Sequence, residues 1–238
     1  MDNDVARTAE FYQLVKWYHA NRQRVISVSV GVLVIGAAIG GFISHKQYVE
    51  SQAAEAFSNV KLPPTAQAAA NPSASDALPY IKVADDYSGT RSAARALLIA
   101  GSIQFDAGQF DAAQKTFQRF MSDYSASPLA NQALLGIASS LEAQGKVDAA
   151  AAAYDDLIKR HLADSTTPQA KSALARLYVA QGKPEQAMHL YEELARANNN
   201  DTWSAEAGIQ LQELLAKYPN LTKPAAAPKP SATPLPLK

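Results

Sequence analysis

The most prominent feature of the hydropathy pattern is an uncharged run of 20 residues, from position 25 to position 44. As an α-helix rising ~1.5 Å per residue, this run would span ~30 Å, which is one bilayer crossing. A cleaved signal peptide usually has an apolar region of ~7–15 residues that ends in a small-x-small site. Residues 42–44 form a poor cleavage site, although Ala38-x-Gly40 leaves cleavage open as the alternative. The pattern favours an uncleaved transmembrane helix.

Basic residues are unevenly distributed around this run. Arg7, Lys16, Arg22 and Arg24 precede it, whereas the 20 residues after it hold only Lys46 and Lys61. By the positive-inside rule, residues 1–24 form a cytoplasmic N-terminal segment and the remainder of the chain is exported. In a bacterium with two membranes, this predicts a single-pass inner-membrane protein whose main domain is periplasmic.

Small residues recur four positions apart inside the run, as Gly36 and Gly40 and as Ala37 and Gly41. This arrangement lets two membrane helices approach closely, which predicts a helix–helix contact site. Glycine is common in membrane helices in general, so the alternative without a specific contact stays open.

A repeat with a period of 37 residues follows further along the chain. Three segments align without gaps, beginning at Gly108, Gly145 and Gly182. The matched columns are Gly108, Gly145 and Gly182; Asp111, Asp148 and Glu185; Ala113, Ala150 and Ala187; Phe117, Tyr154 and Tyr191; and Phe120, Leu157 and Leu194. Internal repeats of this length are typical of solenoids, in which each unit packs on its neighbours.

Each repeat predicts two antiparallel helices. An amphipathic stretch precedes each glycine, and the glycine ends that helix in the left-handed conformation. The acidic residue three positions later begins the second helix and complements its dipole. Small residues at Gly101, Ala138 and Ala175 stand where the two helices cross. The fold class is therefore all-α, with one N-terminal transmembrane helix followed by an α-solenoid of antiparallel helix pairs.

The same register assigns the remaining segments. Residues 45–75 form a juxtamembrane helix and a Pro/Ala-rich loop, and Tyr80 and Val83 belong to the second helix of a degenerate leading repeat. The repeat domain covers 76–219, with repeats near 94–130, 131–167 and 168–202. A capping helix at 203–218 has its apolar residues at Ala205, Ile209, Leu211, Leu214, Leu215 and Tyr218. The Pro/Ala-rich tail at 220–238 is expected to be disordered.

The unit resembles the tetratricopeptide repeat, which has a small residue at position eight, Gly at fifteen, Ala at twenty and an aromatic residue at twenty-four. Counted from Ala94, Asn131 and Pro168, this chain matches those positions. It departs in lacking the early Trp and in a period of 37 instead of 34. The resemblance implies a superhelix whose concave face binds other proteins.

The resemblance also implies which residues line that groove, because the first helix of each pair faces it. Those positions are Arg95, Leu98, Ser102 and Phe105; Gln132, Leu135, Ser139 and Glu142; and Gln169, Ser172, Arg176 and Val179. This mixture of polar and apolar side chains suits weak, broad contact with extended or unfolded segments. Which of these residues bind and which only pack stays open.

Composition narrows the function further. Lys and Arg together number 22, as do Asp and Glu, so the net charge is zero, which argues against a nucleic-acid binder. There is no cysteine, which excludes thiolate metal sites and cysteine nucleophiles. None of the four histidines stands in a metal-ligand spacing, and no catalytic motif occurs. We therefore expect no enzyme activity, no cofactor, no metal and no small-molecule substrate.

The combination of a short cytoplasmic segment, one span and an exported array resembles the ancillary SecYEG translocon subunits (YfgM-like proteins). This resemblance implies partners in the Sec translocon, a periplasmic folding factor and newly translocated chains. Two alternatives stay open: an envelope-assembly scaffold for outer-membrane or peptidoglycan machinery, and a membrane-anchored regulator of a cytoplasmic partner.

Overall fold

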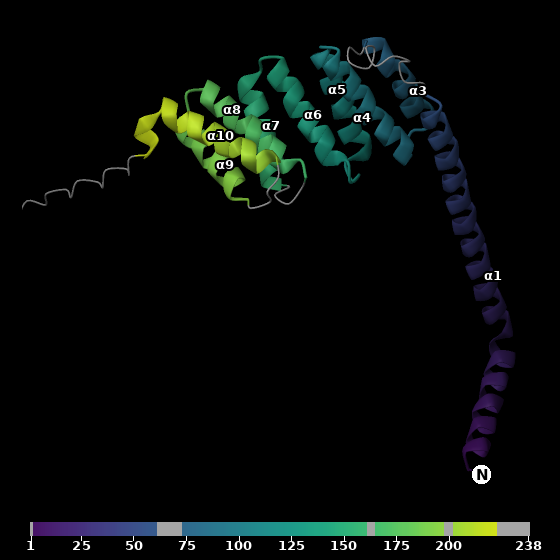
Figure 1. Ribbon diagram of the computed structural model, residues 1–238. Coiled ribbons are helices and arrows are strands. Elements are labelled where there is room, and N and C mark those ends of the chain that lie inside the picture. Colours follow the sequence, from purple (N-terminus) through teal and green to yellow (C-terminus); the bar gives the residue numbers. More distant parts are fainter. Residues whose placement is uncertain (1, 61–72, 161–164, 198–201, 223–238) are drawn as a thin grey trace, which may run out of the picture. The chain divides into compact units, whose positions relative to one another are not determined.

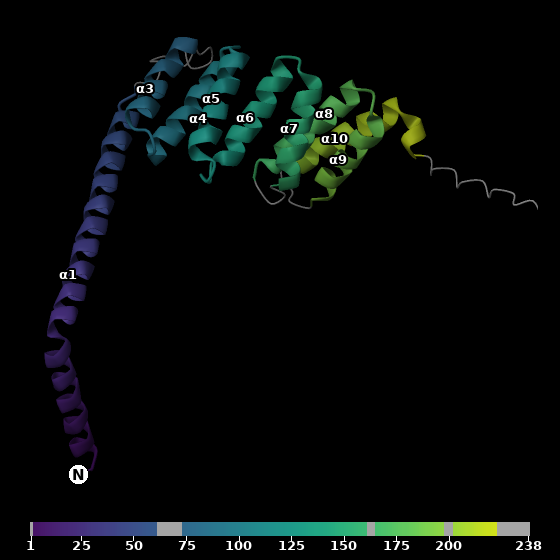
Figure 2. The same cartoon turned by 180° about the vertical axis from the view of Figure 1, so that it is seen from behind.

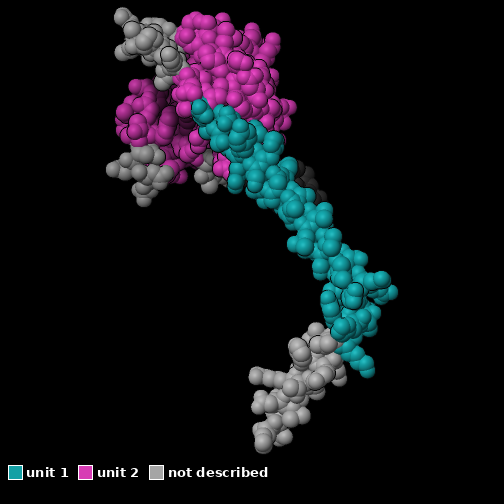
Figure 3. All heavy atoms as spheres, turned by 90° about the vertical axis from the view of Figure 1, so that its right-hand side faces the viewer, with its two compact units in different colours: residues 1–55 teal, residues 56–238 magenta. Residues whose placement is uncertain are grey.

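The computed structural model describes residues 2–60, 73–160, 165–197 and 202–222, with side chains from residue 16 onward. Every regular element in these ranges is a helix, which confirms the all-α prediction. The chain divides into two compact units, residues 1–55 and residues 56–238 (Figure 3). The predicted loop at 61–72 and the tail from 223 onward lie outside the described residues.

The first unit is formed by one long helix, α1 (Asp2–Ser58), which extends beyond both ends of the predicted span and whose last three residues belong to the second unit. Its segment from Lys16 to Ser58 is the one described helix that is long and apolar enough to cross a membrane. Large apolar side chains cover its surface, and Leu33 and Phe42 are each about 70% exposed. Among the described residues, a Cβ placed on Gly36, Gly40 or Gly41 would meet no atom within 4 Å, so the helix surface at these glycines is open.

The second unit is a stack of helices that lie side by side in chain order (Figures 1 and 2). After a 3-10 turn, η1 (Ala74–Ala77), the helices are α3 (Leu78–Asp86), α4 (Arg91–Asp106), α5 (Phe110–Tyr124), α6 (Ala130–Ala143), α7 (Val147–Arg160), α8 (Thr167–Ala180), α9 (Pro184–Arg196) and α10 (Thr202–Lys217), followed by η2 (Pro219–Thr222). Each helix packs mainly on the one before it and the one after it. This confirms the solenoid of helix pairs.

The repeated glycines end the first helix of each pair, as the sequence predicts. Gly108, Gly145 and Gly182 have φ values of 74°, 72° and 69°. In the first copy, the Gly108 N–H donates to the Phe105 carbonyl and the Gln109 N–H donates to the Gln104 carbonyl. This pair of bonds is the Schellman motif, and it recurs at the other two glycines. The turn between the two helices of a pair is thus set by one residue without a Cβ.

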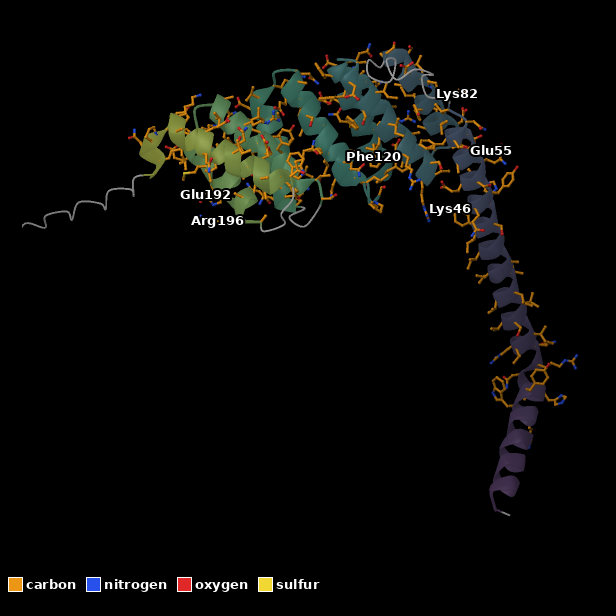
Figure 4. All side chains as sticks on the ribbon, viewed as in Figure 1. Lys46, Glu55, Lys82, Phe120, Glu192 and Arg196 are labelled. Atoms are coloured by element: carbon orange, nitrogen blue, oxygen red, sulfur yellow. The ribbon has the colours of Figure 1, made fainter. Side chains whose placement is uncertain are left out.

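The small-residue columns lie in the core. Ala113, Ala150 and Ala187 are fully buried, and so are Ala138 and Ala175 in the facing column. Methyl groups here allow two helix backbones to approach each other, since a larger side chain would separate them. Phe120, labelled in Figure 4, is also fully buried and fills the space between neighbouring helices.

The leading and trailing elements complete the array. Tyr80 and Val83 of α3 are buried, and the Phe57 and Tyr80 rings pack edge to face with centroids 5.9 Å apart. At the other end, Leu214 of α10 is buried, but Ile209 is 53% exposed. Not all apolar residues of the predicted capping helix therefore lie in the core. The buried positions of α10 are instead Ala207 and Leu214, which lie seven residues, or about two turns, apart.

Side-chain hydrogen bonds tie successive pairs together. The Gln144 amide, at the end of α6, donates to Gln114 Oε1 of α5 at 2.9 Å. One period later, the Gln181 amide donates to Asp148 Oδ1 of α7 at 3.0 Å. The residues before Gly145 and Gly182 therefore each bond back to the preceding helix and link one pair to the next.

Candidate binding groove

The first helices of the pairs line a groove that consists of two adjoining hollows. One hollow has a volume of about 240 Å³ and lies between α4, α6 and the start of α8. The other, of about 590 Å³, continues between α6, α8 and α10. Phe105, Ser139 and Gln169 line both, so the two hollows form one continuous groove.

Most of the positions predicted from the repeat register lie in this groove. The residues that line one or both hollows are Leu98, Ser102, Phe105, Gln132, Leu135, Ser139, Glu142, Gln169, Ser172 and Arg176. Val179 lies apart from them, in a separate hollow of about 180 Å³ next to α10. Arg95 is exposed and lines none of these hollows. The structure thus brings ten predicted residues together and leaves two outside.

The groove also contains residues that the register does not predict. Tyr154 reaches it from α7, the second helix of its pair, and Trp203 and Glu206 reach it from α10. Asp106 lies at the C-terminal end of α4 and lines the smaller hollow. Their position shows that a second helix and the last helix contribute to a face that we assigned to first helices only.

A hydrogen-bond network occupies the floor of the larger hollow. The Tyr154 hydroxyl donates to Glu142 Oε2 at 2.8 Å and lies 3.0 Å from Ser139 Oγ. Arg176 Nη2 approaches Glu142 Oε1 at 3.6 Å. Burial raises the pKa of the Tyr154 phenol above its ordinary value of 10.0, and the hydrogen bond to Glu142 acts in the same direction. The hydroxyl is therefore a neutral donor that holds the Glu142 carboxylate in place.

The smaller hollow has a different character. Leu98, Leu135, Phe105 and Phe117 give it an apolar floor, and the amides of Gln132 and Gln169 stand at its wall. The Phe117 ring fits between two glycines, because a Cβ on Gly101 or on Gly136 would lie 2.6 Å or 2.5 Å from it. The groove therefore changes from apolar to polar along its length.

Several charged side chains outside the groove form ion pairs with each other. On α8 and α9, Lys171 Nζ lies 2.6 Å from Glu193 Oε2, and the hydrogen bond from Lys171 lowers the pKa of Glu193. Figure 4 labels Glu192 and Arg196 of α9, which form an ion pair at 3.0 Å. Within the described residues, no group of three or more His, Asp or Glu side chains is placed to hold a metal ion.

Stacked antiparallel helix pairs with a groove along their first helices define a helical-repeat protein that binds other proteins. The sequence matches the family model described as tetratricopeptide repeat-like domain over residues 15–155, which is more than half of the chain. A second model, tetratricopeptide repeat, matches residues 171–202. The chain belongs to the tetratricopeptide repeat-like domain family, and its array is a protein-interaction module.

Solved structures include several similar arrays. The kinesin light chain-like repeats of Podosopora anserina are 13% identical, with 75% of this chain and 90% of that chain covered and a TM-score of 0.52. A tetratricopeptide repeat protein from Parabacteroides merdae is 15% identical, with coverages of 62% and 55% and a TM-score of 0.49. PcrH from Pseudomonas aeruginosa is 21% identical, with coverages of 52% and 92% and a TM-score of 0.44. The likeness to the Podosopora repeats concerns the fold alone. No curated protein matches the sequence.

Proposed function

We propose that this protein is a single-span membrane protein that binds extended protein segments in its groove, as an ancillary subunit of the Sec export translocon. The observation that carries the binding role is the continuous groove across α4, α6, α8 and α10. The apolar helix between Lys16 and Ser58 supports the anchor, and the excess of basic residues before position 25 supports a cytoplasmic N-terminus. The array then acts on newly translocated chains in the periplasm, beside a folding factor.

Site-specific photo-crosslinking in intact membranes tests this role. A photoreactive amino acid replaces Gln132, which is exposed in the groove, and in a matched variant it replaces Glu192, which lies outside the groove. We expect translocon subunits or exported chains to be crosslinked from position 132 and not from position 192. Envelope-assembly proteins in place of translocon subunits would overturn the export role in favour of the scaffold alternative. Identical products from both positions would overturn the groove as the binding site.

The orientation is tested separately, and the absence of cysteine makes this simple. Single cysteines are introduced by Thr8→Cys before the span and by Ser125→Cys after α5, where the side chain is exposed. A membrane-impermeant maleimide added to cells with a permeabilised outer membrane should label position 125 but not position 8. Labelling of position 8 alone would show the opposite orientation.

A further inference from the structure

The groove is more acidic than the protein as a whole. Asp106 of α4, Glu142 of α6 and Glu206 of α10 line it, and Arg176 is the one basic residue among the side chains that line the two hollows. The complete chain has equal numbers of acidic and basic residues. The excess of carboxylates is therefore a local property of the groove.

Two of these carboxylates have no cationic partner among the described residues. No Lys, Arg or His nitrogen lies within 4 Å of Asp106, and the Glu206 carboxylate accepts one hydrogen bond, from the Gln210 amide at 3.1 Å. Arg176 already faces Glu142 and therefore compensates that acid. Outside the groove, Glu192 and Glu193 of α9 are each paired with a base.

Aromatic rings stand beside these carboxylates. Phe105 lines both hollows, and Trp203, which is 37% exposed, lines the larger hollow together with Glu206. A cation next to a carboxylate and an aromatic face gains from both, because the face of the ring carries partial negative charge. A carboxylate guest gains from neither, because both the acids and the ring faces repel negative charge.

The groove wall offers further groups to a polypeptide backbone. Gln132 and Gln169 lie one repeat period apart, both line the smaller hollow, and both are exposed. Within the described residues, neither amide has a hydrogen-bond partner. An extended chain exposes one N–H and one C=O per residue, which is what such amides bind.

We propose, on the basis of the proposed function, that the groove binds an extended polypeptide segment in which a Lys or Arg side chain is flanked by apolar residues. The cationic side chain lies against Asp106 or Glu206, and its apolar neighbours contact Leu98, Leu135 and Phe105. The choice follows from charge complementarity, since the groove carries uncompensated negative charge that a positively charged segment neutralises.

The test uses the full-length protein in mild detergent and fluorescein-labelled peptides built of Ser, Gly and Leu. The central residue is Lys, Arg, Met or Glu, and binding is measured by fluorescence anisotropy. We expect the Lys and Arg peptides to bind about threefold to tenfold more tightly than the Met peptide, with the Glu peptide weakest, since exposed ion pairs contribute modestly. This preference should decrease as the salt concentration rises.

The doubly substituted variant Asp106→Asn, Glu206→Gln should bind the four peptides with nearly equal affinity. Glu192→Gln is the matched control, because it removes an acid outside the groove, and it should keep the preference. Circular dichroism checks the fold of both variants, and Asp106 and Glu206 are exposed.

Each outcome bears on one of the two proposals. Equal binding of all four peptides by the wild-type protein, or an unchanged preference in the double variant, would overturn the cationic guest while leaving the groove as a binding site. If none of the four peptides binds, the proposed function itself fails, and the cationic guest fails with it.

Discussion

The first and second repeats place different side chains at the same register position. In the first repeat, Phe117 is 4% exposed, and its ring lies between two glycines, Gly101 and Gly136. In the second repeat, 37 residues later, the equivalent glycine positions hold Ala138 and Ala173, and the ring is Tyr154. The Tyr154 hydroxyl is bonded to Glu142 and lies within hydrogen-bond distance of Ser139.

This difference shows that one repeat position serves two purposes. The first repeat holds its ring by close packing, which glycine makes possible because it has no Cβ. The second repeat holds its ring partly by hydrogen bonds, and the same bonds position a carboxylate in the groove. A matched column in the sequence therefore identifies the fold of a repeat without fixing what that residue contributes to the site.

The strongest test of this contrast is removal of the first ring. Phe117→Ala should lower the free energy of unfolding by about 3–5 kcal/mol, because it leaves a cavity between two helices that cannot easily close. Denaturant unfolding of the full-length protein in mild detergent, followed by circular dichroism, measures this change. A loss below about 1 kcal/mol would show that the ring is not part of the core.

A smaller effect is expected from filling the space that glycine leaves. Gly136→Ala places a Cβ 2.5 Å from the Phe117 ring, which should cost about 1–3 kcal/mol of stability in the same measurement. Gly208→Ala in α10 is the control, since its Cβ meets nothing within 4 Å. That variant should gain about 0.5–1 kcal/mol from the removal of a helical glycine. Changes of the same sign in both variants would contradict close packing at Gly136.

In the second repeat, the hydrogen bonds can be removed without removing the ring. Tyr154→Phe should cost about 0.5–1.5 kcal/mol, because Glu142 and Ser139 lose the hydroxyl of a buried side chain as a hydrogen-bond partner. Tyr191→Phe, at the same column of the third repeat, is the comparison variant. No described side chain forms a hydrogen bond with the Tyr191 hydroxyl, so this substitution should cost less. Equal costs for the two substitutions would argue against the network as the source of the difference.

The smallest expected effect is a pH dependence that comes from the Tyr154 phenol, whereas the ring at this column of the first repeat, Phe117, does not titrate. Burial raises the pKa of the Tyr154 phenol in the folded protein above the ordinary value of 10.0. The folded state therefore favours the neutral phenol. The contribution of Tyr154 to the stability of the folded protein is complete below about pH 10 and declines as the pH rises further. The unfolding midpoint of the wild type should fall more steeply than that of Tyr154→Phe in this alkaline range. Parallel curves for the two proteins would contradict a raised pKa.

The sequence predicts the repeated parts of the fold well, because each repeat confirms the others. Three glycines at one spacing identify the helix ends, and the structure shows all three with positive φ. Gly136 could not be assigned in this way, since Ile99 and Ala173 occupy its column in the neighbouring registers. Gly89 also has a positive φ, of 83°, but the residue 37 positions later is Ala126, so the repeat does not identify it either.

The groove is predictable only where it follows the repeat. Ten of its residues come from first helices whose positions the register gives. Trp203 and Glu206 belong to α10, which does not share the repeat pattern, so no column points to them. Tyr154 is buried between helices, and its hydroxyl also reaches the groove. Such a double role depends on side-chain length and direction, which a register does not contain.

The neighbour-to-neighbour packing of α3 to α10 also affects the order in which the array is assembled during synthesis. Contacts between elements that are close in sequence form quickly, because little chain entropy is lost in bringing them together. Each helix pair finds its main partner in the segment made just before it. The array is therefore suited to fold progressively from its N-terminal end as the chain emerges, without waiting for its last residues.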